Sequence, residues 1–147
     1  MKTIKLTNII LFLILVTGNL QAQDWQTDMQ KARQMATKEN RNILLVFSGS
    51  DWCAPCIKLE EKIWKSNEFR QYAQEHLIMV RADFPRRKRN KLPKELAAKN
   101  KELAKKYNPN GYFPYVLLLR PDGKVLGATG YKGDYTPADY IKLFESM

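Results

Sequence analysis

The most informative segment of the sequence is Ser48-Gly49-Ser50-Asp51-Trp52-Cys53-Ala54-Pro55-Cys56, because it joins an apolar run to a helical pattern. The run from residue 42 to 47 is apolar after its first residue, which is typical of a strand buried on both faces of a sheet. Residues 54–64 then place apolar side chains at helical spacing. Cys53 and Cys56 are the only two cysteines. A Cys-x-x-Cys pair at a strand-to-helix junction is a candidate for a dithiol that cycles between reduced and oxidised forms.

The sequence on either side of this segment predicts alternating helices and strands. Helices are expected at residues 28–39, 67–75, 93–107 and from 136 onward. Strands are expected at residues 77–83, 115–119 and 124–128, the last two joined by a hairpin turn. Thr27 and Thr136 are the expected N-caps of the first and last helices. Parallel strands connected through helices, followed by an antiparallel hairpin, predict a three-layer α/β domain.

The order of these elements and a second motif, Gly111-Tyr112-Phe113-Pro114-Tyr115 before a strand, resemble the thioredoxin family. The resemblance covers roughly residues 25–147, and residues 48–53 are most similar to the exported thioredoxin-like branch. It implies a thioredoxin-like three-layer α/β/α fold, with a central mixed sheet of four to five strands flanked by helices. The first strand of the family is not evident, so we expect it to be short or absent.

The two cysteines have different expected roles in a redox-active disulfide. Cys53 would sit at a helix N-terminus, where free backbone N–H groups and the helix dipole stabilise a thiolate, the form that attacks disulfides. Cys53 is therefore predicted to be the catalytic nucleophile. Cys56 lies one turn deeper, is expected to be the more buried of the two, and would be the resolving thiol.

Four further residues are expected to form the wall of the site. Trp52 would shield Cys53, and packing in the core is the alternative role for an aromatic residue of this size. Pro55 fits the first helical turn, where its missing N–H breaks no hydrogen bond. The resemblance implies that the Phe113–Pro114 bond is cis and faces the dithiol. It also implies that the backbone of Phe113 binds an extended substrate as an added strand would.

Three positions depart from the thioredoxin pattern: Phe47, Glu61 and Ala54, the last standing where the family has glycine before Pro55. Phe47 stands where, counting back from Cys53, the family has a buried aspartate that assists the resolving thiol. Glu60, one turn after Cys56, is a candidate replacement, and a solvated helix position is the alternative. Glu61 stands where the family has a helix-kinking proline. These departures leave the fold prediction intact and the redox potential open.

Residues 1–22 have the pattern of a secretory signal peptide. Lys2 and Lys5 precede an apolar run over residues 9–16, and the segment closes on the small residue Ala22. The run is shorter than the ~20 apolar residues of a membrane span, with an uncleaved anchor as the alternative. We therefore predict an exported protein, periplasmic or extracellular. Residues 23–147 would form one thioredoxin-like domain with no stable membrane insertion after signal removal.

The net charge of +10 is concentrated in residues 81–106. This segment holds eleven basic residues and three acidic ones, and it is the part least similar to the family. A solvated face is one interpretation, and a docking surface for an acidic partner is another. Nucleic-acid binding is not predicted, because no aromatic residues alternate with the basic ones between Phe84 and Tyr107.

Together these features predict an exported thiol-disulfide oxidoreductase that exchanges disulfides with protein substrates and with an unidentified redox partner, in the reducing direction. No metal or organic cofactor is implied, since a closed zinc site needs about four Cys or His ligands and only His76 accompanies the two cysteines. The alternatives are an oxidant or isomerase on the same fold, or a non-enzymatic binding or assembly module. A purely structural staple is a weaker alternative, because a loop this short gains little from cross-linking.

Overall fold

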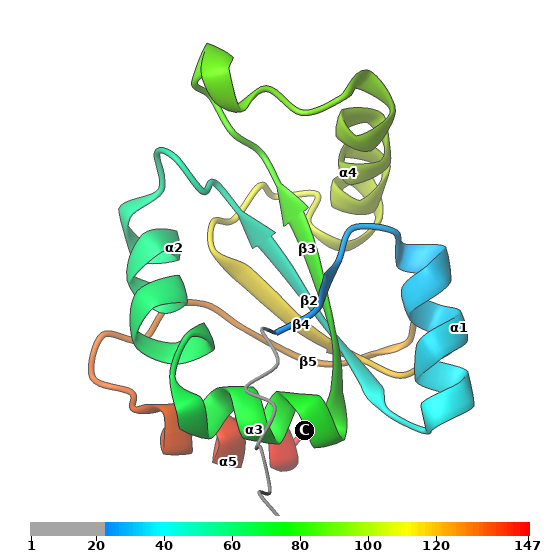
Figure 1. Cartoon of the computed structure of the whole chain (residues 1–147), viewed down its shortest axis with the longest axis vertical. Coiled ribbons are helices and arrows are strands. Elements are labelled where there is room, and N and C mark those ends of the chain that lie inside the picture. Colours follow the sequence, from blue (N-terminus) through cyan, green and yellow to red (C-terminus); the bar gives the residue numbers. More distant parts are fainter. Residues whose placement is uncertain (1–22) are drawn as a thin grey trace, which may run out of the picture.

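One five-stranded sheet organises the chain, in the order β1-β3-β2-β4-β5 (Figure 1). The computed structural model describes residues 23–147, and the predicted signal peptide lies outside the described residues. The strands are β1 Trp25–Gln26, β2 Asn42–Ser48, β3 Leu77–Asp83, β4 Tyr115–Leu119 and β5 Val125–Thr129. The helices are α1 Met29–Glu39, α2 Ala54–Leu59, α3 Asn67–His76, α4 Lys94–Tyr107 and α5 Pro137–Glu145. A π-helical turn, η1 Glu60–Trp64, continues α2, and a 3-10 turn, η2 Lys88–Asn90, precedes α4.

The strand directions confirm the predicted mixed sheet of the three-layer α/β/α fold. Strands β1, β3 and β2 are parallel, β4 is antiparallel to β2, and β5 is antiparallel to β4. The first strand is the two-residue β1, which is too short to show a hydrophobic period in the sequence.

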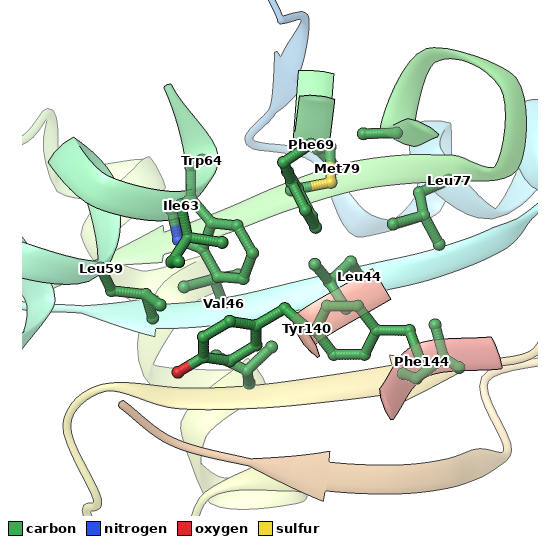
Figure 2. Close-up of a cluster of buried hydrophobic side chains, with 13 residues drawn as sticks. Leu44, Val46, Leu59, Ile63, Trp64, Phe69, Leu77, Met79, Tyr140 and Phe144 are labelled. Carbon is green, nitrogen blue, oxygen red and sulfur yellow. The ribbon is translucent and has the colours of Figure 1, made fainter. Parts of the chain in front are cut away.

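Strand β2 lies at the centre of the sheet and supplies both halves of the core. Leu44 and Val46 face a cluster built with α2, η1, α3 and α5, whereas Ile43, Leu45 and Phe47 face α1 and α4. Figure 2 shows the first cluster, in which aromatic rings from η1, α3 and α5 converge above β2. Each fully buried side chain of this size contributes about 1.5–3 kcal/mol to folding. The continuous apolar run therefore forms a two-faced strand because helices cover both sides.

The helix starts follow local capping chemistry, with one correction. The N-cap of α1 is Asp28, whose carboxylate accepts hydrogen bonds from the backbone N–H groups of Gln30 and Lys31. The prediction of Thr27 was wrong, because the backbone remains extended through Asp28 and the carboxylate is favoured at a helix N-terminus. Thr136 caps α5 in a capping box with Asp139, as predicted.

Candidate active site

Cys53 and Cys56 form a disulfide at the junction between the loop after β2 and the first turn of α2. Cys53 is the N-cap, and its Sγ accepts a hydrogen bond from the backbone N–H of Cys56 at 3.3 Å. Each cysteine is 4% exposed. The expectation that Cys56 is the more buried is therefore wrong for this oxidised form, because the disulfide bond keeps both cysteine side chains buried together. Pro55 is exposed in the first helical turn, as predicted.

Trp52 is fixed by contacts on several sides. Its Nε1 donates to the carbonyl oxygen of Phe84 at 2.7 Å, and its ring meets Phe113 edge-on with centroids 5.4 Å apart. The guanidinium carbon of Arg86 lies 3.6 Å from its ring centroid. A Cβ on Gly49 would lie 2.3 Å from the indole, so only glycine leaves room for the ring. Trp52, which is partly buried, thus packs against Phe84, Phe113 and Arg86, and its shielding of Cys53 stays a prediction.

The Phe113–Pro114 peptide bond is cis, as the resemblance implies. Phe113 packs between Trp52 and Phe84, the second contact at 5.5 Å between centroids. Directly before this bond, the backbone of Tyr112 is held by a buried side chain that the sequence interpretation missed. Asn108 donates its Nδ2 to the oxygen of Tyr112 at 2.8 Å and accepts from its N–H at 2.9 Å. An asparagine at a helix end, followed by Pro-Asn-Gly, is a turn signal that could have identified it.

A groove of about 410 Å³ runs beside these residues. Pro55, Phe113 and Pro114 line it together with Tyr112 and Tyr131, which sequence reasoning did not single out. Trp52, Cys53 and Cys56 are not among its lining residues, although Trp52 contacts Phe113, which is. Tyr131 comes from the loop after β5, and the adjacent Gly130 allows this loop to lie close to the backbone of Pro114. A Cβ on Gly130 would lie 3.3 Å from the oxygen of Pro114.

The strand residue beneath α2 is Val46 and not Phe47. Val46 shares a buried cluster with Leu59 of α2, whereas Phe47 lies on the opposite face of the sheet with α1 and α4. Successive side chains of a strand point to opposite faces, so Phe47, at the position of the family's aspartate, packs instead with Phe84 and Phe113. Both residues are apolar, so β2 still presents no acid to either face at this point.

Glu60 forms an ion pair with Arg81 of β3 and is not a freely solvated residue. Each side chain is 27% exposed, and Arg81 also lies 4.0 Å from the ring centroid of Trp25. Glu60 opens η1, in which Glu61 replaces the family's proline. The widened π-helical turn therefore occupies the stretch in which this chain lacks the family's helix-kinking proline. Arg81 is thus the partner of the carboxylate that we considered as a replacement for the missing aspartate.

Within residues 23–147, no three His, Cys, Asp or Glu side chains converge to hold a metal ion. The helices of this range are too short or too polar to cross a bilayer.

Comparisons with known proteins agree with this geometry. A thioredoxin-like family model matches residues 24–121. The disulfide bond reductase DsbH of Chlamydia pneumoniae is 36% identical over 118 residues, covering 80% of this chain and 67% of that protein. The thioredoxin-related protein DsbJ of the same organism is 28% identical, and the match spans only 31% of its length. The solved structure of a DsbH oxidoreductase superposes with a TM-score of 0.76 at 33% identity, covering 87% of this chain and 91% of that one.

Proposed function

Because this chain belongs to the thioredoxin-like family, we propose that it is an exported disulfide reductase in which Cys53 attacks and Cys56 resolves. Its homology to DsbH and its Cys53–Cys56 pair make it a thiol-disulfide oxidoreductase. The roles of the two sulfurs, the direction of exchange and the export are the parts that we propose. The single observation that carries the roles is the position of Cys53 as the N-cap of α2.

In the reducing direction, the reaction begins with both thiols free. The Cys53 thiolate attacks one sulfur of a substrate disulfide, forms a mixed disulfide and releases the other sulfur as a thiolate, which takes up a proton. The Cys56 thiolate then attacks the Cys53 sulfur, closes the intramolecular disulfide and releases the second substrate thiol. Two electrons have passed to the substrate, so a dithiol donor must reduce the pair again.

The local structure favours Cys53 for the first step. The N–H of Cys56 already points at the Cys53 sulfur, and in the reduced protein this donor would stabilise a thiolate. The groove lined by Pro55, Phe113 and Pro114 suits an extended peptide around the substrate cysteine. Tyr112, with 56% of its surface exposed, would add an apolar contact at the rim.

A trapping experiment tests the roles of the two sulfurs. We expect Cys56→Ser to accumulate mixed disulfides with substrate proteins, because the resolving step is lost while the attacking thiol remains. Cys53→Ser should accumulate none, and the double variant controls for other cysteines. Trapping by Cys53→Ser alone would assign the nucleophile to Cys56 and overturn the proposed order.

The reducing direction is supported by the similarity to a disulfide bond reductase and by the Trp-Cys-x-Pro-Cys sequence. Equilibration of the pair with glutathione buffers separates this direction from oxidation or isomerisation. A reduction potential of the Cys53–Cys56 pair of about −270 mV would support the reducing direction, and one of about −120 mV would indicate an oxidant.

Export rests on the signal-like pattern of residues 1–22. Expressed with this segment in a bacterium, the protein is expected in the periplasmic fraction with Gln23 as its first residue. Intact mass measurement would show this, and an uncleaved protein in the membrane fraction would contradict it.

A further inference from the structure

The stretch after β3 forms a basic strap, residues 85–91, that is tied to the loop in front of the dithiol. The carboxylate of Asp51 accepts from the backbone N–H groups of Arg86 and Arg87 at 2.9 and 3.0 Å, and from the side chain of Asn90 at 2.9 Å. Asp51 directly precedes Trp52 and Cys53. In Figure 1, the strap and the loop before α2 leave the same end of the sheet. The strap is therefore held beside the site.

Within residues 23–147, none of the five basic side chains of the strap takes part in an ion pair: Arg86, Arg87, Lys88, Arg89 and Lys91. The Asp51 carboxylate accepts from the strap backbone and attracts the Arg87 cation, and Asp83 accepts from Ser50. A cluster of like charges repels itself in the folded chain and raises the local concentration of anions.

An apolar cleft of about 370 Å³ lies next to the strap. Phe84, Leu92 and Ala98 line it together with the exposed lysines Lys91, Lys94 and Lys101. One acid, Asp83, also lines it, and its carboxylate accepts from the backbone N–H and hydroxyl of Ser50. Phe84 also connects this cleft with the site, because its carbonyl accepts from Trp52 and its ring packs on Phe113. A segment bound in the cleft would therefore be separated from Cys53 by the side chains of Trp52 and Phe113.

We propose that the basic strap and this cleft dock an acidic segment of the protein substrate, with one apolar side chain in the cleft and carboxylates on the surrounding cations. This inference rests on the proposed function, because docking here places the substrate disulfide near Cys53. Apolar residues next to three lysines fit a peptide that carries both apolar and acidic side chains. A membrane surface or a nucleic acid would use the charges but not a cleft of this size.

Three synthetic peptides, each with one disulfide, test the proposal. The first carries glutamates and a leucine beside the disulfide, the second replaces the glutamates by glutamines, and the third replaces the leucine by serine. We expect kcat/KM for reduction of the first peptide to exceed that of the second by about tenfold at low salt, and the difference to vanish at high salt. The third peptide should react more slowly than the first at both salt concentrations.

A matched pair of variants assigns this preference to the strap. The triple variant K88E/R89E/K91E should lose the preference for glutamate and keep its rate with neutral hydroxyethyl disulfide. The control K38E/K124E/K142E changes the net charge equally at exposed positions on other elements and should keep the preference. Ala98→Phe, which would fill the cleft from an exposed helix position, should remove the preference for leucine.

Failure of the docking proposal is distinguishable from failure of the proposed function. The docking proposal alone is overturned if hydroxyethyl disulfide is reduced normally but the glutamate preference survives in the strap variant. It is also overturned if the control variant loses the preference to the same extent. Absence of reduction with every disulfide overturns the proposed function. Strap-dependent binding to phosphatidylglycerol vesicles without any peptide preference would reject a protein segment in favour of a membrane surface.

Discussion

Gly49 and its neighbours Ser50 and Asp51 fix the loop between β2 and α2 through contacts with a distant segment. Ser50 donates its backbone N–H and its hydroxyl to the carboxylate of Asp83, at 2.9 and 2.6 Å. Asp51 accepts from the strap, and Gly49 leaves the space that the Trp52 indole fills. Three consecutive small or short side chains therefore place Trp52 and, next to it, Cys53.

Substitution of Gly49 tests the close approach of Trp52. We expect Gly49→Ala to lower the free energy of unfolding by about 1–3 kcal/mol, because the added methyl group overlaps the indole and displaces it. Urea denaturation measures the change. Gly133→Ala is the control, since its nearest neighbour would be 3.9 Å away, and it should change stability by about 0.5 kcal/mol or less. Equal effects of the two substitutions would refute the packing.

The Asp51 carboxylate predicts a dependence on pH. The hydrogen bond from the backbone N–H of Arg86, followed by those from Asn90 and Arg87, holds the pKa of Asp51 below its ordinary value of 3.8. Since the folded pKa is the lower one, the stabilisation is complete above the unfolded value and is lost as the pH falls through the folded value. We expect the amide NMR signals of Arg86 and Arg87 to shift together below about pH 3.8.

Two variants assign that transition. Asp51→Asn should abolish it, whereas Asp134→Asn, at an exposed acid of the loop before α5, should leave it unchanged. A transition that persists without the Asp51 carboxylate would mean that another group anchors the strap.

The N-cap residues of α1 and α2 each have a second role beyond starting the helix. Helix α1 begins at Asp28, whose Oδ2 also accepts from Lys99 of α4 at 2.7 Å. This contact joins the two helices that cover one face of the sheet. Helix α2 instead begins at a cysteine, so the cap position that would normally hold an oxygen acceptor holds the reactive sulfur.

Removal of the α1 cap distinguishes the two candidate positions. Asp28→Ala should lower the free energy of unfolding by about 0.5–2 kcal/mol, because two backbone N–H groups lose their acceptor. Thr27→Ala should have an effect of about 0.5 kcal/mol or less in the same urea titration. Lys99→Ala isolates the exposed ion pair and should have a smaller effect than Asp28→Ala, because solvent screens exposed charges. A larger loss from Thr27→Ala than from Asp28→Ala would contradict the observed cap.

Across the molecule, the last helix supports the groove beside the dithiol. Tyr140 is fully buried among the aromatic rings of the first cluster, shown in Figure 2. Its hydroxyl donates to the oxygen of Gly130 at 3.0 Å and accepts from the N–H of Lys132 at 2.8 Å. These two bonds flank Tyr131, which lines the groove. The core and the groove are thus connected through one side chain.

Tyr140→Phe tests this connection. We expect the free energy of unfolding to fall by about 1–3 kcal/mol, because two backbone groups lose their hydrogen-bond partner. KM for peptide disulfides should rise, while the rate with hydroxyethyl disulfide should remain unchanged. Tyr135→Phe is the control, since the hydroxyl of Tyr135 makes no hydrogen bond within residues 23–147. If Tyr135→Phe raises KM equally, the groove does not depend on the two Tyr140 bonds.

The helices, the strands and the dithiol could be predicted from local sequence, because periodicity, caps and the Cys-x-x-Cys spacing depend on residues within a few positions of one another. The sequence therefore predicted the mixed sheet, the Thr136 cap and the placement of Cys53 at a helix start. It misplaced the α1 cap by one residue. The contact of Arg86 with Trp52 and the place of Tyr131 in the groove follow from the tertiary structure alone. These contacts join segments that are far apart in the sequence, and their geometry is set by how the sheet and helices pack rather than by neighbouring residues.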